Sequence, residues 1–257
     1  MLEFILLFAA VGFLAQIVDG ALGMAYGLIC STVLLALGVP PATASASVHI
    51  AELFTTAASG GAHLHYHNVD FRMFWRLVPA GILGGILGAY VLTGVDAGIM
   101  RPIVVVYLGI MGLIILWRAI RPGVQHILTA RATGVVGVVG GFSDAVGGGG
   151  WGPMVTSALM ASGAHPRHVI GTVNTAEFLV AFTISATFVW ALLSGHWTNA
   201  GSLMNHAAAV IGLTAGGVIA APLAGLVVKR VPARVLAAIV GVVVLGLCAY
   251  QAWLLLG

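Results

Sequence analysis

The chain has 257 residues, of which 60% are hydrophobic and only 7% are charged, and its mean hydropathy is +1.11. A water-soluble domain of this size needs far more charge on its surface, so the composition excludes a soluble protein and predicts an integral membrane protein. The net charge of +3 does not indicate a nucleic-acid partner, because basic residues in membrane proteins mainly set orientation.

Apolar stretches follow one another along the chain, separated by polar residues, glycine or proline. They cover residues 4–18, 26–37, 42–62, 74–93, 101–117, 132–143, 152–162, 167–193, 200–228 and 235–256. A bilayer core needs about 20 helical residues. The stretches 26–37 and 152–162 are too short to span it comfortably, so each belongs to a broken or re-entrant helical hairpin. Whether the hairpin arms are re-entrant or short crossings is left open.

The second half of the chain resembles the first. Asp19–Gly27 has the sequence DGALGMAYG, and Asp144–Gly152 has the sequence DAVGGGGWG. Without a gap, VHIAE at 48–52 then falls on VNTAE at 173–177. Many membrane transporters are built from two such homologous halves. We therefore predict a single membrane unit made of two transmembrane repeats, residues 1–125 and 126–257.

The distribution of Lys and Arg distinguishes parallel from inverted repeats. If each broken segment crossed once, five basic residues would lie on each side of the membrane. If each returns to its own side, nine lie on one side and only Arg101 lies opposite, which the positive-inside rule favours. The sequence thus predicts an all-α polytopic membrane protein of two inverted-topology repeats. Each repeat is a broken or re-entrant helical hairpin plus three transmembrane helices, and both termini face away from the cytoplasm.

The Gly-rich breaks are candidate anion-binding elements. The residues concerned are Gly23, Gly27, Gly148, Gly149 and Gly150. Backbone N–H groups at a helix start lack an intrahelical partner, and the helix dipole favours an anion there. Two helix starts that meet near the bilayer midplane would bind a small anionic solute, whereas the alternative is that the glycines only allow close packing. Trp151 lies inside the second break, where it either lines the solute path or plugs it.

Four acidic residues lie in apolar sequence. Asp19 and Asp144 precede the breaks, and Glu52 and Glu177 lie in the helices that follow. A carboxylate in the bilayer interior is costly and is usually paired, protonated or in a wet cavity. We expect Asp19 and Asp144 to bond free N–H groups of the broken helices. Glu52 and Glu177 are candidates for carrying a coupling proton or, alternatively, for tying helices together.

Polar residues accompany the two glutamates. His49 lies three residues before Glu52, on the same helix face, and Asn174 has the matching place before Glu177. Each side chain can donate to an anion, although a histidine in a packed apolar helix is more often a satisfied core residue.

A histidine cluster suggests an alternative function, a divalent metal-cation transporter that uses histidine and acidic residues. His63, His65 and His67 alternate near a span end. Their spacing places them on different helix faces, and no cysteine or carboxylate completes a ligand set. We therefore expect no metal site there.

At these segments the chain resembles the TauE/SafE sulfite exporter family, which is related to toluenesulfonate uptake permeases. The segments are DGALGMAYG (19–27), GGFSDAVGGGGWGPMVTSALMASG (140–163), HIAE (49–52) and NTAE (174–177). The resemblance covers essentially the whole length. It implies secondary transport of small sulfur-containing anions such as sulfite, sulfoacetate or other organosulfonates, usually outward across the bacterial inner membrane.

We expect neither a cofactor nor an enzymatic activity. The G-x-G-D and G-x-S-G patterns of intramembrane proteases are absent, and a catalytic site would not require duplicated breaks. The expected partners are the small anion and the lipid bilayer, and homo-oligomerisation is left open.

Overall fold

The chain folds into a bundle of helices in a computed structural model that describes residues 2–120, 129–162, 164–197, 203–228 and 232–256. The first half contains α1 (Leu2–Leu22), α2 (Tyr26–Ala36), α3 (Pro41–His65), α4 (Phe71–Gly94) and α5 (Ala97–Ile120). The second contains α6 (Ala130–Gly147), η1 (Gly152–Thr156), α7 (Ser157–Ala161), α8 (Pro166–Leu193), α9 (Leu203–Val228) and α10 (Ala233–Leu256). The described residues include no strand.

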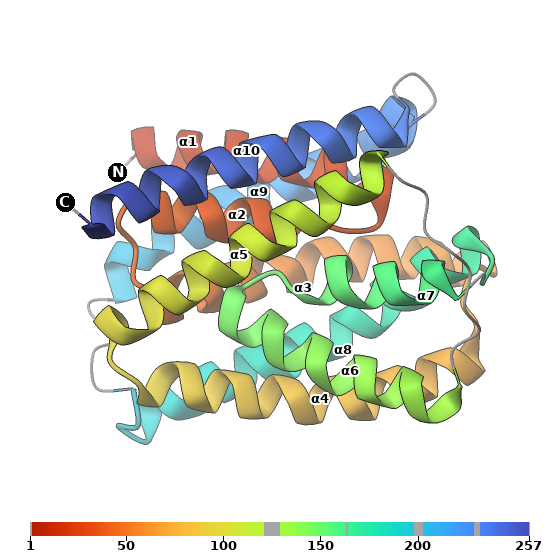
Figure 1. Cartoon of the computed structure of the whole chain (residues 1–257), viewed down its shortest axis with the longest axis horizontal. Helices are drawn as coiled ribbons and strands as arrows, with labels where there is room; N and C mark the ends of the chain where they lie inside the picture. The colour runs from red at the N-terminus through yellow and green to blue at the C-terminus, as the bar shows by residue number, and fades with distance from the viewer. Residues whose placement is uncertain (1, 121–128, 163, 198–202, 229–231, 257) are drawn as a thin grey trace.

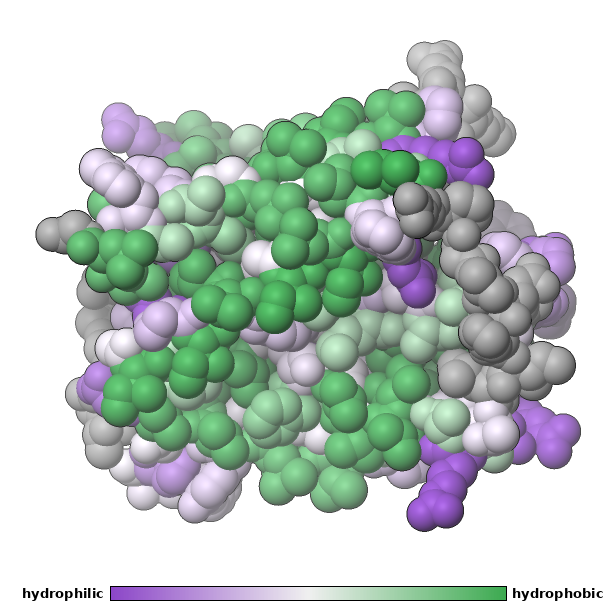
Figure 2. Space-filling model, in the orientation of Figure 1, coloured by the Kyte–Doolittle hydropathy of each residue, from purple (hydrophilic) through white to green (hydrophobic). Residues whose placement is uncertain are grey.

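The protein is an all-helical, multi-pass membrane protein. Five helical segments are long and apolar enough to cross a membrane: Leu2–Gly20, Phe71–Gly94, Ala97–Ile120, Pro166–Leu193 and Arg234–Leu256. Large apolar side chains dominate the middle of the visible surface, and hydrophilic residues gather toward its two ends (Figure 2). Such an apolar belt matches the hydrocarbon core of a bilayer.

The short elements run back beside the helices that precede them. After α1 the chain turns and α2 packs along it, and after α6 the chain turns into η1 and α7 (Figure 1). α1 has 21 residues, which is enough to span the hydrocarbon core, whereas α2 has only 11. Both termini lie on the same side of the bundle (Figure 1).

Helix pairs from opposite halves build the bundle. α1 packs against α9, α4 packs against α6, α5 packs against α10, and α3 packs against α8. Gly84 of α4 lies against the backbone of Val138, and Gly216 of α9 lies against the backbone of Ala9. No side chain fits at either contact, so small residues let these helices approach closely, as is usual between helices in lipid.

The second short segment differs from the single helix that the sequence suggests over 152–162. It begins as a π-helix over Gly152–Thr156 and becomes α-helical only at Ser157–Ala161. Pro153 lies in its first turn, where a missing backbone N–H costs no intrahelical hydrogen bond. π-helical turns are rare and occur frequently at functional sites, which directs attention to this break.

Candidate functional site

The two Gly-rich breaks lie against each other inside the bundle. A Cβ atom added to Gly27 would lie 2.7 Å from Gly149 Cα, and one added to Gly152 would lie 2.9 Å from Met24 Cα. The two segments therefore run past each other in opposite directions, 24 beside 152 and 27 beside 149. Their backbones are too close for a side chain between them, which is a physical reason for glycine at these positions.

Each break turns through a glycine in the left-handed region, because Gly23 and Gly148 both have a φ of 66°. Only glycine adopts this conformation without steric cost. Ala25 also has a positive φ, 99°, and a residue with a Cβ atom is strained there. The first break thus carries backbone strain at its junction with α2.

Both aspartates bond to the backbone of the break that follows them. Asp144 Oδ1 accepts from the N–H of Gly150 (2.7 Å) and from that of Trp151 (3.0 Å). Asp19 Oδ1 accepts from the N–H of Tyr26 (3.3 Å). The aspartates thus occupy three amides of the two breaks, and of the glycines expected to bind an anion only Gly150 is among them.

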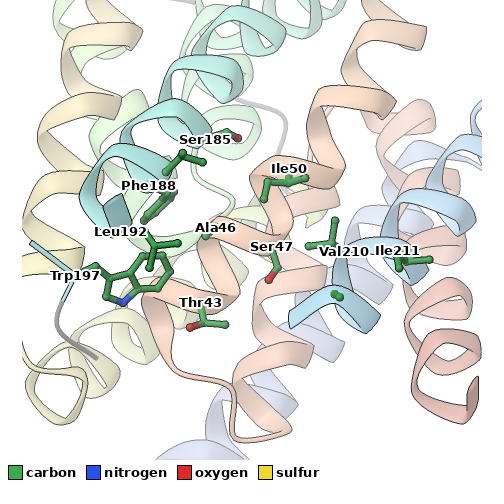
Figure 3. A pocket seen from close by; sticks show the side chains of 12 residues that line it. Thr43, Ala46, Ser47, Ile50, Ser185, Phe188, Leu192, Trp197, Val210 and Ile211 are labelled. Carbon is green, nitrogen blue, oxygen red and sulfur yellow. The ribbon is translucent and has the colours of Figure 1, made fainter. Parts of the chain in front are cut away.

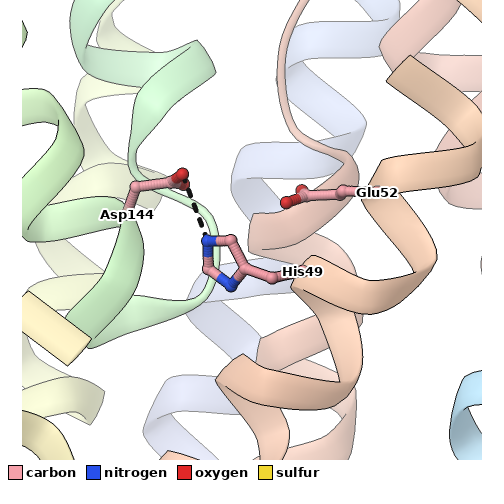
Figure 4. Close-up of side chains that lie close together, drawn as sticks. All are labelled: His49, Glu52 and Asp144. Atoms are coloured by element: carbon pink, nitrogen blue, oxygen red, sulfur yellow. Dashed lines mark hydrogen bonds and ion pairs between the residues drawn. The ribbon is translucent and has the colours of Figure 1, made fainter. Parts of the chain in front are cut away.

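His49 connects the two halves of the chain. Its Nε2 lies 3.2 Å from Asp144 Oδ2, and its Nδ1 lies 2.8 Å from the carbonyl oxygen of Ser45 (Figure 4). Ser45 Oγ donates to the carbonyl oxygen of Ala145 at 2.6 Å. His49 and Asp144 are both fully buried, so α3 and the second break are joined by a polar network without contact with solvent.

Glu52 lies one helical turn after His49 and completes a buried group of three. One imidazole nitrogen of His49 and one carboxylate oxygen each of Glu52 and Asp144 all lie within 4.8 Å of one another (Figure 4). Glu52 is 2% exposed, and its Oε2 has no hydrogen-bond partner in the structure. Its other carboxylate oxygen faces Gly27, where an added Cβ atom would lie 2.6 Å away. Three titratable side chains, two from α3 and one from α6, thus share one buried site.

The matching residues of the second half have different partners. Asn174 Nδ2 donates to the carbonyl oxygen of Ile170, and Ser59 Oγ donates to Asn174 Oδ1 at 3.3 Å. Asn174 therefore bonds to α3 and to its own helix, not to the first break. Glu177 is buried in α8.

Trp151 fills space next to the second break. Its side chain is fully buried, and its Nε1 donates to the carbonyl oxygen of Val173 at 3.2 Å. The ring lies against Gly81 of α4 and Gly140 of α6, where added Cβ atoms would meet it. Trp151 thus packs between helices in this conformation, and the packing closes the break on that side.

A cavity of about 270 Å³, which sequence reasoning missed, lies between α3, α8 and α9 (Figure 3). Its walls are mostly apolar, but Thr43 Oγ1 and Ser185 Oγ are buried there without a hydrogen-bond partner. Phe188 lines the cavity and lies 6.2 Å from the ring of His49, between ring centres. Phe188 therefore borders both the cavity and the ring of His49.

The histidines near the end of α3 do not form a ligand cluster. His63 Nδ1 pairs with Asn68 Nδ2 at 3.1 Å, and the His65 ring stacks edge-on against Tyr66. His65 and His67 are exposed. Within the described ranges, the group of metal-binding types that the fold brings together is the buried one around His49.

The chain is similar in sequence to known membrane proteins. The family model described as sulfite exporter TauE/SafE matches residues 8–251. A protein of Bacillus subtilis (strain 168), described as the probable membrane transporter protein YtnM, is 40% identical over 244 residues, covering 92% of this chain and 79% of that protein. No solved structure matches the chain.

Proposed function

We propose, from the premise that this chain belongs to the TauE/SafE sulfite exporter family of membrane transporters, that it is a secondary transporter of small sulfur-containing anions. Sulfite, sulfoacetate and other organosulfonates are the proposed solutes, and export across the bacterial inner membrane is the proposed direction. The observation that carries the proposal is the crossing of the two Gly-rich breaks beside a buried polar network. Discontinuous helices that meet near the midplane are the usual solute site of such transporters.

The proposed solute site comprises the breaks and the polar residues of α3 and α8. Its members are Gly23, Gly27, His49, Gly148, Gly149, Gly150, Trp151 and Asn174. Asp144 Oδ1 supports this site, because it already occupies two break amides with a negatively charged oxygen atom. An oxyanion presents the same kind of acceptor and would take such amides when the carboxylate releases them.

We propose that the two halves form inverted repeats and that both termini face the periplasm. α1 begins on the side of the bundle where both termini lie, whereas its counterpart α6 begins on the opposite side (Figure 1), and these opposite directions support inversion. Basic residues near helix ends also support it: Arg72 and Arg76 begin α4, Arg118 ends α5, and Arg131 and Arg167 begin α6 and α8. Arg121, Lys229 and Arg230, which belong to the same predicted side, lie outside the described residues.

The membrane potential supplies the drive for export. A monovalent anion that leaves a negative interior gains about 2.3 kcal/mol per 100 mV. Movement in the other direction requires a coupled cation, and Glu52 and Glu177 are the proposed proton carriers because both are buried near the breaks. Alternating access then moves the elements of one repeat against those of the other.

Transport in proteoliposomes tests the proposal. We expect the purified protein to move sulfite or a sulfonate from a panel of sulfur oxyanions, with a rate that depends on an imposed pH gradient. Replacing His63, His65 and His67 together by glutamine is expected to leave this transport unchanged. If the protein moves divalent metal ions and the triple variant is inactive, the metal-cation alternative is correct instead.

A topology reporter tests the proposed orientation. A reporter inserted after Leu193, at the end of α8, is expected on the outer side, together with both termini. A reporter inserted between α3 and α4, after His67, is the matched control and is expected in the cytoplasm. The opposite labelling of the two sites would show that the positive-inside assignment is wrong.

A further inference from the structure

The hydrogen bonds of His49 determine where its protons lie. Nδ1 is 2.8 Å from the carbonyl oxygen of Ser45, which can only accept, so Nδ1 carries a hydrogen. Ser45 Oγ, 3.3 Å from the same nitrogen, already directs its own hydrogen to the carbonyl oxygen of Ala145. Both neighbours of Nδ1 are therefore acceptors, and the tautomer is set by the fold of α3.

The opposite ring nitrogen faces a second acceptor. Nε2 lies 3.2 Å from Asp144 Oδ2, in a region where both side chains are fully buried. With Nδ1 protonated, a neutral imidazole would direct the Nε2 lone pair at a carboxylate oxygen, which is repulsive. The contact is stable only if a proton lies between the two atoms, either on Nε2 of the ring or on Oδ2 of the carboxyl group.

The acidic side chains around His49 and Asp144 make it more favourable for this pair to hold a proton. Glu52 comes from α3, Asp19 from α1 and Glu177 from α8, and all of them interact electrostatically with one another or with Asp144. From α5, the neutral hydroxyl of Tyr107 reaches the break at Gly150. Several negative charges in a site of low dielectric are costly unless protons or other cations neutralise them.

We propose that His49 and Asp144 share one exchangeable proton and form the proton-coupling site of this transporter, with Glu52 as the group that next accepts the proton. The inference rests on the proposed function above and moves the main coupling role to the His49–Asp144 pair. Glu52 suits the second role because its Oε2 is buried, unpartnered and in the same group of three.

The position of the proton on the His49–Asp144 pair affects anion binding, because Asp144 also bonds to the second break. Asp144 Oδ1 holds the amides of Gly150 and Trp151 while Oδ2 faces His49. A protonated carboxyl group accepts hydrogen bonds more weakly than a carboxylate does. Transfer of the shared proton from the His49 ring to the Asp144 carboxylate therefore loosens these amides and removes one negative charge, so that an anion can take the place of the carboxylate oxygen. Return of the proton to the ring restores the original bonds and expels the anion.

The first half of the chain supplies a matched control. Asp19 bonds the amide of Tyr26 just as Asp144 bonds that of Trp151, but among the described residues no histidine bonds to it, and Asn174 bonds to Ser59 instead. The shared proton thus belongs to one break only. An Asp19→Asn variant and an Asp144→Asn variant make the same chemical change in the two breaks, and both keep an amide oxygen that can accept from the backbone.

The first experiment measures transport of methanesulfonate, which stays ionised at all pH values used, in proteoliposomes at different pH. We expect wild-type transport to rise up to about tenfold per pH unit of acidification on the loading side. In Asp144→Asn and in His49→Gln this dependence is expected to fall below about twofold, whereas Asp19→Asn is expected to keep a steep dependence whose midpoint alone shifts, because one neighbouring acidic group is removed. His49→Gln keeps the test decisive if Asp144→Asn does not fold.

The second experiment does not depend on transport. An infrared pH titration of the purified protein is expected to show a carboxylic-acid C=O band that is lost or shifted in both Asp144→Asn and His49→Gln, but kept in Asp19→Asn. If this band behaves as expected while the wild type moves no sulfonate, the proposed solute is wrong, but the proposal that His49 and Asp144 share a proton is kept. If both variants keep the wild-type pH profile and the wild-type band, the proposal of a shared proton is wrong. Loss of wild-type transport on chelation of metal ions would also overturn the inference, since the cation would then be a metal.

Discussion

Replacing Gly149 by alanine is expected to abolish transport and to lower the stability of the protein. The new Cβ atom would lie 2.7 Å from Leu28 Cα and would overlap the backbone of the first break still more closely elsewhere. Overpacking of this kind costs about 1–3 kcal/mol when side chains can adjust, and here the obstacle is backbone. The breaks would have to separate, which destroys the crossing on which the proposed solute site depends.

Gly134→Ala is the matched control for this prediction. Gly134 lies in α6, the same helix that carries Asp144, but an added Cβ atom there meets no atom within 4 Å. Alanine also favours the helix by about 1 kcal/mol relative to glycine. Thermal unfolding in detergent and transport in proteoliposomes should therefore be unchanged or slightly improved. Wild-type transport by Gly149→Ala would mean that the breaks tolerate separation and that their contact is not required.

Replacing Trp151 by alanine is expected to destabilise the protein by about 3–5 kcal/mol, the usual cost of removing a buried aromatic side chain. The indole is fully buried and fills the space that Gly81 and Gly140 leave open. Its removal also leaves the second break without support on the side of α4, so transport is expected to fall together with the unfolding temperature. Thermal unfolding of the purified variant measures the first effect.

Two further tryptophan variants separate packing from hydrogen bonding. Trp151→Phe retains most of the ring contact and loses only the Nε1 donor to Val173, so about 1 kcal/mol of destabilisation is expected. Trp253→Ala removes a side chain that is 68% exposed near the end of α10, and its unfolding temperature should match the wild type. Equal unfolding temperatures for Trp151→Ala and Trp253→Ala would contradict the packing role of Trp151.

The helices could be predicted closely from the sequence, because each depends on residues that are near one another in the chain. The apolar stretch 26–37 corresponds to α2 at Tyr26–Ala36, and 167–193 corresponds to α8 at Pro166–Leu193. The two breaks were identified from their glycines and their repeated spacing. The π-helical turn after the second break was not predicted, since one extra residue per turn depends on what packs around Pro153.

The candidate site was predicted only in part. The sequence indicated that Asp19 and Asp144 bond to the break amides, and the structure has such bonds at Tyr26, Gly150 and Trp151. It did not indicate that His49 reaches Asp144, because the two residues are 95 positions apart and belong to different halves. The cavity beside Phe188 was also missed, since its walls come from three helices whose packing no local pattern specifies. The inverted relation of the repeats stays a prediction.

Composition and hydropathy alone determined that this chain is a membrane protein, because transfer of apolar segments into lipid sums over neighbouring residues. The tertiary structure decided which groups of the two halves meet. Corresponding motifs have unequal surroundings: Asp144 faces His49, whereas its counterpart Asp19 bonds to no histidine in the described part of the chain. A buried charge is stable only beside a partner, and the partner is supplied by helices that are distant in the chain and adjacent in the bundle.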